Sequence, residues 1–332
     1  MSFISVNCKH KWREATDAVT IEFDVTDLPQ AKPGQFVTLG VEIEGRVHYR
    51  AYSISGMSSQ TAMQLTVKKI SGGVVSSHIV DNLQVGDPLQ VSLPAGQFNC
   101  IDIQHKEKVL LLSAGSGVTP LMAMLRYWQT RDNQPDIHLV HVARRPSDTL
   151  FHAELSALAA ASQIKLSLFF TRTDSPARLT QSALLALCED VTERTVLMCG
   201  PDGLMQDASR WLQAVGVDED NIYQEAFATT ANTENDSLSA LSMPATATVS
   251  VPAFNASVHV DHQSPLIDAL EEMQLPVIAA CRSGVCGSCK CKIVKGEAVT
   301  TSQETLTEQE IENGYVLACS TVIDADVEVE LV

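Results

Sequence analysis

The stretch AACRSGVCGSCKCKIVKGE, residues 279–297, holds four of the nine cysteines of this 332-residue chain. Cys281, Cys286 and Cys289 follow the spacing C-x4-C-x2-C, and Cys319 comes later in the segment VLACS. One tight loop can supply three thiolates and a distant strand end the fourth. The pattern therefore predicts that four sulfurs meet at one point, as an inorganic cluster requires.

This spacing is typical of the [2Fe–2S] cluster of plant-type ferredoxins. Gly284 and Gly287 permit the backbone to turn its N–H groups toward the sulfurs. A zinc site or a set of free thiols is the alternative, but zinc usually takes paired C-x2–4-C segments and only one x2 pair is present. The iron–sulfur interpretation is the stronger one.

The remaining cysteines have no cluster role in this interpretation. Cys291 lies two residues after Cys289 and is expected to be a packed thiol. Buried packing is likewise expected for Cys8, Cys100 and Cys188.

Composition limits the class of protein. The formal charge of −17 disfavours nucleic acid as a partner and favours a protein with a basic face. The N-terminal residues contain no run typical of a signal peptide, and no apolar run approaches the length of a membrane span. We therefore expect a cytoplasmic protein, in which clustered cysteines indicate metal or redox chemistry more than disulfides.

The order of sequence patterns predicts a multi-domain chain. Residues 1–104 show short alternating strands between Pro, Gly and Asp, which predicts an antiparallel β-barrel. Residues 105–228 alternate apolar strands with helical patterns, which predicts a doubly wound α/β parallel sheet. Residues 229–247 are interpreted as a linker. Residues 248–332 are expected to be the third domain, for which the resemblance to plant-type ferredoxins implies an α+β fold of the β-grasp type.

A nucleotide-type sheet beside a one-electron cluster indicates a third cofactor. A nicotinamide gives up two electrons together as hydride, whereas this type of cluster accepts one at a time. Flavin is the usual group between them. A flavin site is therefore expected in the β-rich residues 1–104.

The segment RAYS at residues 50–53 resembles the R-x-Y-[ST] motif of the ferredoxin–NADP reductase superfamily. The resemblance implies that Arg50 binds a flavin phosphate. It places Tyr52 against the isoalloxazine ring and Ser53 near the ring N5. By itself the motif is short, and an ordinary surface arginine is the alternative for Arg50.

The segment GGVVSSHIV, residues 72–80, resembles the second phosphate segment of the same superfamily. Gly73 and Ser76 would hold a pyrophosphate, with backbone contacts from Val67 and Lys69. Many relatives have Gly where this chain has Val75.

The segment LLLSAGSGVTP, residues 110–120, predicts a strand, a tight turn at Gly115 and Gly117, and a helix that begins near Pro120. A helix N-terminus offers N–H groups to a diphosphate, although a purely structural turn is the alternative. The resemblance implies nicotinamide binding here, with Thr119 between flavin and nicotinamide.

The segment MCGP, residues 198–201, completes the resemblance and implies a Cys beside the nicotinamide. Ser53, Thr119 and Cys199 are the implied catalytic residues. The further cofactor contacts implied here are Gly200, Pro201, Met205, Glu225 and Phe227.

The resemblance implies an NADH-dependent oxidoreductase that passes electrons from NADH to FAD, to the [2Fe–2S] cluster and on to a protein. FMN is the less favoured flavin. NADPH stays possible, because Arg144, Arg145 and Arg172 follow strand ends and are candidates for a 2′-phosphate site. A non-enzymatic ferredoxin-type carrier is the alternative of a different class.

The acceptor is expected from the ferredoxin part. The segments PVIAACRSGVCGSCK, GEAVTTSQETLTEQEI and GYVLACS resemble reductases that serve hybrid-cluster protein. A component of a Rieske-type oxygenase or demethylase is the next candidate. Residues 248–332 contain thirteen Asp or Glu against four Lys or Arg, with Glu304, Glu308, Glu310 and Glu312 in one segment. This acidity predicts docking to a basic-rimmed acceptor, with solubility as the alternative.

Overall fold

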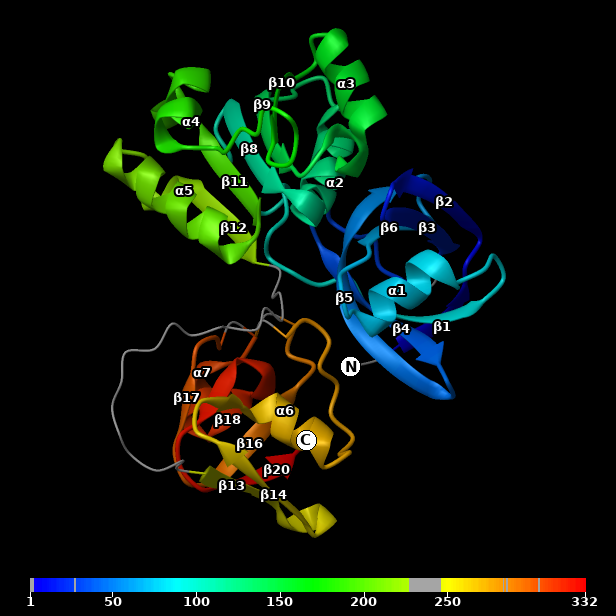
Figure 1. Cartoon of the computed structure of the whole chain (residues 1–332), viewed down its shortest axis with the longest axis vertical. Coiled ribbons are helices and arrows are strands. Elements are labelled where there is room, and N and C mark those ends of the chain that lie inside the picture. The colour runs from blue at the N-terminus through cyan, green and yellow to red at the C-terminus, as the bar shows by residue number, and fades with distance from the viewer. Residues whose placement is uncertain (1–2, 27, 227–245, 283, 285, 304) are drawn as a thin grey trace. The chain divides into compact units, whose positions relative to one another are not determined.

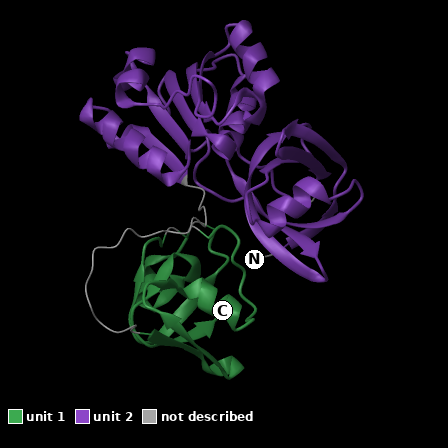
Figure 2. Ribbon diagram, in the orientation of Figure 1, with its two compact units in different colours: residues 1, 228–332 green, residues 2–227 purple. Residues whose placement is uncertain are grey.

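The computed structural model describes residues 3–26, 28–226, 246–282, 284, 286–303 and 305–332. Residues 2–227 form one compact unit, and the second unit begins at Ala228 (Figure 2). The expected cofactor contact Phe227, the acidic residue Glu304 and most of the expected linker lie outside the described residues.

The N-terminal part of the first unit is an antiparallel sheet in the order β1-β7-β4-β5-β6-β3-β2 (Figure 1). Its elements are β1 (Phe3–Asn7), β2 (His10–Ala15), β3 (Ala18–Asp24), β4 (Phe36–Ile43), β5 (Arg46–Met57), β6 (Ala62–Lys68), α1 (Val74–Asp81) and β7 (Pro88–Ser92). Apolar side chains of strands and helix, such as Ile21, Leu39 and Ile79, are fully buried in one core. This is the barrel that the sequence predicted, in partly open form.

The second part of the first unit is a five-stranded parallel sheet in the order β10-β9-β8-β11-β12. Its strands are β8 (Lys108–Ala114), β9 (Asp136–Ala143), β10 (Lys165–Phe170), β11 (Thr195–Gly200) and β12 (Ile222–Ala226). The chain adds β9 and β10 on one side of β8 and then returns to place β11 on the other side. Ligands of such sheets bind where the order reverses, outside the carboxyl ends of the strands.

Helices cover both faces of this sheet (Figure 1). They are α2 (Val118–Trp128), α3 (His152–Ala160), α4 (Gln181–Leu187) and α5 (Asp202–Ala214). Leu111 packs with α2 and α3 on one face, and Leu112 packs with α4 and α5 on the other. Successive strand residues are thus buried on opposite faces, which explains the continuous apolar run of β8.

The second unit has one mixed sheet in the order β14-β13-β20-β16-β18 and a small sheet β15-β19-β17. Its elements are β13 (Thr246–Val251), β14 (Ala256–Asp261), β15 (Ser264–Pro265), α6 (Leu266–Glu272), β16 (Lys290–Lys295), β17 (Ala298–Thr300), α7 (Glu308–Glu312), β18 (Tyr315–Leu317), β19 (Thr321–Ile323) and β20 (Val327–Leu331). Helix α6 packs its apolar face on the larger sheet. This is the expected α+β ferredoxin fold.

Two expected boundaries differ in detail. Strand β13 begins at Thr246, two residues inside the segment interpreted as a linker, because its ladder with β14 already starts there. The boundary at 104/105 lies within one compact unit and stays a prediction. No helix in the described part of the chain is long and apolar enough to cross a membrane.

The fully buried Leu111 provides a test of the parallel sheet. We expect Leu111→Ala to lower the free energy of unfolding of residues 2–227 by about 2–5 kcal/mol, since it leaves a cavity between β8 and α2. All three tryptophans lie in this unit, so urea unfolding followed by tryptophan fluorescence reports on it alone. The control Leu93→Ala, at a side chain that is 48% exposed, should change little. Equal losses in both variants would contradict this packing.

Candidate functional site

The RAYS motif lies in the middle of β5. Tyr52 packs against the barrel core, and burial raises the pKa of its phenol despite the opposing charge of Arg50. The Arg50 side chain donates from Nη1 to the carbonyl of Tyr49 at 2.7 Å. The phenol is therefore neutral at physiological pH and the arginine carries a fixed positive charge close to it.

The expected second phosphate segment forms the start of α1. Gly73 caps this helix without a side-chain hydrogen bond, so the first-turn N–H groups point out of the helix end. The Ser76 hydroxyl, however, accepts from the N–H of Ile70 and donates to the carbonyl of Gly73. Val75 is buried in the barrel core.

Backbone contacts from Val67 and Lys69 were also expected. Val67 is fully buried and pairs with Val19 in the ladder between β3 and β6. The N–H of Lys69 donates to the carbonyl of Asp17 at 2.7 Å, and its Nζ pairs with Asp81. The Lys69 N–H is therefore already engaged within the barrel.

The turn after β8 is a 3₁₀ segment, Gly115–Gly117, and α2 begins at Val118, two residues earlier than predicted. Gly115 has a positive φ of 57°. Gly117 is required for a different reason: a Cβ there would lie 2.1 Å from the carbonyl oxygen of Cys199. The turn therefore lies directly on the end of β11, at the point where the strand order reverses.

Thr119 is in the first turn of α2 and is almost fully buried. Its hydroxyl donates to the carbonyl of Ser116 at 2.9 Å, which fixes the side chain against the glycine turn. The structure thus brings Thr119 to the same strand ends as Cys199.

A row of polar side chains crosses the carboxyl ends of the strands. Ser113, Cys199 and Glu225 are neighbours in register on β8, β11 and β12. The hydroxyl of Ser53, on the barrel strand β5, donates to Glu225 Oε2 at 3.3 Å. Residues that lie 172 positions apart are thereby joined, so that the RAYS strand and the nucleotide sheet share one site.

Cys199 is not an ionised thiol in this row. Its side chain is 1% exposed, and burial, aided by the charge of Glu225, raises the pKa of the thiol well above its usual value. The Cys199 thiol is therefore uncharged. It adds a small neutral side chain to the lining of the site and does not serve as a nucleophile.

Sequence reasoning missed the other end of this row. His141 on β9 is fully buried and lies 2.8 Å, by its Nδ1, from the hydroxyl of Ser113. Burial, and next the charge of Lys68, lowers the pKa of His141 to about 4, so the ring is neutral at pH 7. Its Nε2 has no hydrogen-bond partner among the described residues. Two histidines within the otherwise apolar segment IHLVHVA were the available signal.

The residues after Cys199 have differing environments. Gly200 is buried and close to Ala114, and the exposed Pro201 caps α5. Met205 packs into the core on the α4 and α5 face with Met198. The structure therefore places Met205 among core side chains, and its expected contact with a nicotinamide has no support from this packing.

The three arginines considered for a 2′-phosphate also differ. Arg144 forms ion pairs with Asp17 at 2.5 Å and with Asp148 at 3.2 Å. Arg145 and Arg172 are exposed and form no ion pair with any residue that the structure describes. Arg144 is thus already paired with Asp17, in the turn between β2 and β3 of the barrel. Arg145 and Arg172 are the remaining candidates for contact with a 2′-phosphate.

In the second unit the four predicted cluster cysteines converge. The N–H of Gly284 donates to Cys319 Sγ at 3.3 Å, and the N–H of Cys319 donates to Cys289 Sγ at 3.4 Å. Hydrogen bonds that the Cys319 thiol donates to Cys281 and Cys289 raise its pKa, and one donated to Cys281 raises the pKa of Cys286. These contacts link all four cysteines through Cys281 and Cys319, and the backbone donors at two of the sulfurs suit a [2Fe–2S] cluster.

The cysteine loop depends on Gly284, whose φ is 76° and whose Cβ would lie 2.6 Å from the Cβ of Ser302. Cys291 is fully buried in the core of this unit, and burial raises the pKa of its thiol to about 12, so the packed-thiol prediction is confirmed. Within the described ranges, no group of three or more His, Cys, Asp or Glu side chains is placed so that it could hold a metal ion.

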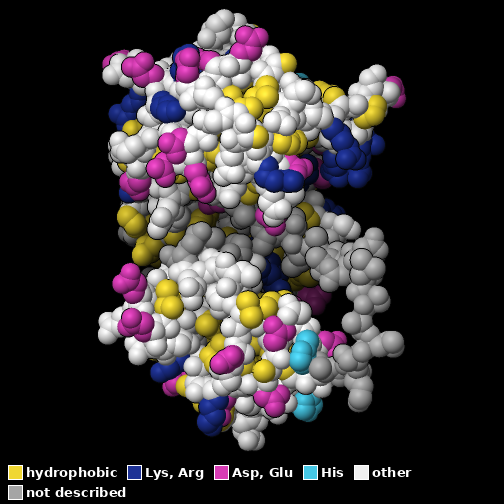
Figure 3. All heavy atoms as spheres, turned by 90° about the vertical axis from the view of Figure 1, so that its left-hand side faces the viewer, with side chains coloured by type: hydrophobic (Ala, Val, Ile, Leu, Met, Phe, Trp, Pro, Cys, Tyr) yellow, Lys and Arg dark blue, Asp and Glu magenta, His cyan; other side chains and the backbone are white. Residues whose placement is uncertain are grey.

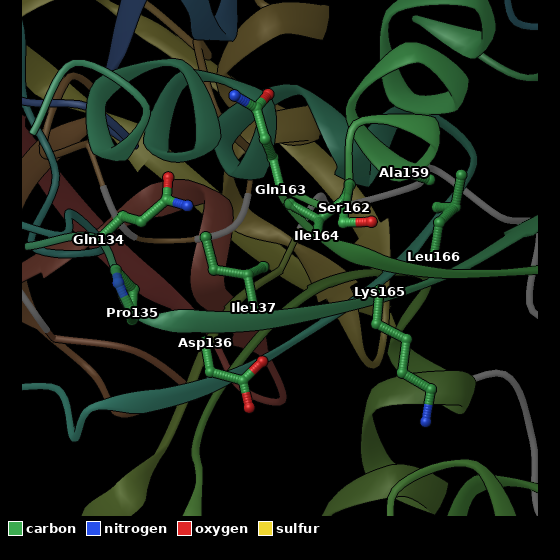
Figure 4. A pocket seen from close by; sticks show the side chains of 10 residues that line it. All are labelled: Gln134, Pro135, Asp136, Ile137, Ala159, Ser162, Gln163, Ile164, Lys165 and Leu166. Atoms are coloured by element: carbon green, nitrogen blue, oxygen red, sulfur yellow. The ribbon is translucent and has the colours of Figure 1, made fainter.

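A surface hollow of about 770 Å³ lies elsewhere, between the starts of β9 and β10 and the end of α3 (Figure 4). Its charged side chains already have partners: Asp136 pairs with Arg194 at 2.8 Å, and Lys165 Nζ donates to the carbonyl of Leu187. Because it lies at the amino ends of the strands, it is remote from the polar row.

Three family models match the chain. They are the oxidoreductase FAD-binding domain over residues 6–100, the oxidoreductase NAD-binding domain over 111–210 and the 2Fe–2S iron–sulfur cluster binding domain over 254–324. Each covers one of the three predicted domains.

Curated relatives match almost end to end. NADH oxidoreductase HCR of Escherichia coli is 35% identical over 94% of this chain and 92% of its own. The glycine betaine monooxygenase reductase subunit of Chromohalobacter salexigens is 32% identical over 98% of this chain and 95% of its own. Among solved structures, phthalate dioxygenase reductase matches with a TM-score of 0.71 and 22% identity, over 99% of this chain and 98% of its own. This last likeness supports the fold.

The contact of Gly117 with β11 leads to a prediction. Gly117→Ala should displace the turn from Cys199, because a methyl group cannot fit at 2.1 Å from the carbonyl oxygen. We expect binding of NAD⁺, measured by calorimetry, to weaken by at least about tenfold, which corresponds to about 1.4 kcal/mol.

The matched control is Gly203→Ala in the first turn of α5, where an added Cβ meets nothing within 4 Å. That variant should bind NAD⁺ as the wild type does. Unchanged binding by Gly117→Ala would show that this turn is not part of the nucleotide site.

Proposed function

The chain belongs to the ferredoxin reductase family of FAD- and NAD-binding oxidoreductases with a fused 2Fe–2S domain, and we propose that it supplies electrons from NADH to a separate redox protein. It is an NADH-dependent oxidoreductase with FAD and a [2Fe–2S] cluster as its cofactors. Electrons are proposed to pass from NADH to FAD, then to the [2Fe–2S] cluster and then to the acceptor protein, in the cytoplasm.

The hydrogen bond between Ser53 and Glu225 carries the proposal. It joins the strand that resembles the flavin motif to the carboxyl ends of the nucleotide sheet, so two ligands bound at these places would meet. When bound, FAD supplies the ability to accept electrons in a pair and release them singly.

Different parts of the first unit are proposed to bind the flavin and the nicotinamide nucleotide. Arg50 and the start of α1, from Gly73 to Ser76, are proposed to hold the flavin phosphates, and Tyr52 covers the ring. The N-terminus of α2, with Gly115, Gly117 and Thr119, is proposed to hold the nucleotide diphosphate. Buried Thr119 and Cys199 keep water away from the reacting atoms, which favours direct hydride transfer.

Ser53 and Glu225 are proposed to carry the proton that leaves the flavin N5. Ser53 is 4% exposed and donates to the carboxylate of Glu225, which is only half-buried and so retains contact with solvent. Hydride transfer would already supply the hydrogen at N5, and this hydrogen would leave as a proton when the electrons are passed on. Ser53 Oγ and then the Glu225 carboxylate would offer that proton a route to solvent.

Cys281, Cys286, Cys289 and Cys319 are the proposed cluster ligands. A full-chain experiment tests the relay. The purified protein should contain FAD, lose its flavin absorbance when NADH is added anaerobically and show a spin-half signal after reduction. A protein that holds no FAD, or is not bleached by NADH, would refute the proposed function.

The variant Cys281→Ser should lose the spin-half signal and still be bleached by NADH, because the flavin site lies in the other unit. Cys291→Ala is the matched control and should keep the signal, since Cys291 lies in the packed core. Loss of the signal in Cys291→Ala alone would reverse the ligand assignment.

We propose hybrid-cluster protein as the first candidate acceptor, supported by the resemblance of the ferredoxin segments. An oxygenase component is the second, supported by relatives named as monooxygenase reductase subunits. Mixing the NADH-reduced protein with each purified candidate, and following reoxidation of its cluster, distinguishes them.

The charge of the second unit supports a basic-rimmed acceptor. Glu310 and Glu328 pair with lysines, whereas Glu272, Glu308 and Glu330 form no ion pair with any described residue. On the face that Figure 3 shows, Asp and Glu side chains are spread over the surface of this unit. The negative charge is thus distributed, which suits steering from a distance.

We expect electron transfer to the acceptor to slow by at least about tenfold between roughly 10 mM and 150 mM salt, as the screening length falls from about 30 Å to about 8 Å. Reduction of the flavin at saturating NADH is the internal control and should change little. A transfer rate that is independent of salt would leave the acidic surface with solubility as its role.

A further inference from the structure

Arg126 on α2 connects the two layers of the first unit, which are the barrel and the part built on the parallel sheet. Its Nη1 donates to the carbonyl of Ser55 at 2.9 Å and to Gln64 Oε1 at 3.2 Å, both on the barrel. Its Nε and Nη2 donate to the two carboxylate oxygens of Glu154 on α3, at 2.9 and 2.6 Å. The guanidinium carbon also lies 5.2 Å from the centre of the Phe151 ring.

The shape of the guanidinium is essential to this arrangement. Its planar fork binds Glu154 with two nitrogens and still directs one N–H group at the barrel strand. A lysine has a single point of charge and cannot do both. Since the Arg126 side chain is only 28% exposed, solvent screens these bonds incompletely.

The barrel strand leaves space for the guanidinium at Gly56. A Cβ on Gly56 would lie 2.5 Å from Arg126 Nη1. Gly56 does not have a positive φ, so its backbone conformation is open to other residues and the space is the constraint. The strand and the arginine are therefore matched to each other by size.

The two elements that Arg126 joins are those of the proposed hydride transfer. Ser55 follows Ser53 by two residues on β5, the strand of the RAYS motif. Helix α2 begins at the Gly115–Thr119 turn. We propose that Arg126 is a positioning residue, which holds the flavin strand and the nucleotide helix at the spacing that hydride transfer requires. This inference rests on the proposed function.

The distance between the nicotinamide and the flavin ring is the quantity that Arg126 is proposed to set. In this step a hydride, a proton with two electrons, leaves the nicotinamide and joins the flavin, so one ring is oxidised as the other is reduced. A misplacement of about 1 Å can slow such a reaction by about a hundredfold. Asp17 with Arg144, and Ser53 with Glu225, also join the two layers, so loss of Arg126 should shift them without separating them.

The test uses the full FAD-loaded chain and three variants. Arg126→Met removes all the bonds, Arg126→Lys keeps only the charge, and Gly56→Ala displaces the guanidinium while every polar group stays. Glu154→Gln is the matched control, because it weakens the α3 side and leaves the bonds to Ser55 and Gln64. Anaerobic stopped-flow reduction by NADH and by 4-deuterated NADH gives a dissociation constant, a limiting rate and its isotope effect.

We expect Arg126→Met and Gly56→Ala to lower the limiting rate by about ten- to a hundredfold. Arg126→Lys should fall between them and the wild type. The NADH dissociation constant should stay within about twofold, since the nucleotide contacts are intact, and Glu154→Gln should keep most of the rate. In amide hydrogen exchange of the oxidised protein without NADH, residues 53–57 and 115–121 should exchange faster in Arg126→Met, and residues 246–332 should not change.

Three results would overturn the inference: unchanged limiting rates in Arg126→Met and Gly56→Ala, an equal loss in Glu154→Gln, or unaltered exchange in both segments. If Arg126→Met fails to fold, Gly56→Ala and Arg126→Lys decide the question. Failure of the proposed function has a different signature, since the wild type itself would then not be bleached by NADH.

Discussion

The contact between the Gly117 backbone and the end of β11 is the constraint on which the nucleotide site depends. With a carbonyl oxygen 2.1 Å from where a Cβ would lie, only glycine permits the turn to rest on Cys199 and Gly200. That approach sets where α2 starts, and α2 in turn carries Thr119 into the strand ends. It also places Arg126 one side chain away from the barrel. The close approach at Gly117 thus fixes the start of α2, and α2 in turn fixes where Arg126 meets the barrel.

Much of this architecture could be predicted from sequence, because it rests on local patterns. The change from short alternating strands to strand–helix alternation identified the barrel and the parallel sheet, and the cysteine spacing identified the third domain. Motifs such as RAYS and AGSGVTP could be placed on a strand and on a turn before a helix. The start of α2 was misplaced by two residues because a 3₁₀ turn precedes it, and nothing in the sequence separates the two kinds of turn.

What the sequence could not supply is the meeting of distant segments. Ser53 and Glu225 are neighbours only because β12 lies beside β11 in register and the barrel closes over that edge. The pairing of Ser113 with His141 depends likewise on the register of β8 and β9. Arg126 reads as an ordinary polar residue of an amphipathic helix until the barrel is placed against it. Met205 illustrates the converse, since its place in a motif suggested a ligand contact and packing puts it in the core.

The cysteine loop shows how the protein itself can prepare a site for a cluster. Arg282, adjacent to Cys281, has a positive φ of 55° and pairs with Asp268 and Glu271 of α6. On the other side, the hydroxyl of Ser302 donates to the carbonyl of Gly284 at 2.9 Å, and Ser320 donates to Ser302. These bonds use neither iron nor sulfide, so the loop is held by its surroundings on two sides. Because the conformational entropy of the loop is lost on folding, binding of the cluster need not supply the free energy to order it. The N–H groups of Gly284 and Cys319 already point at the sulfurs of Cys319 and Cys289, and they would stabilise added negative charge on these sulfurs if a cluster is bound there.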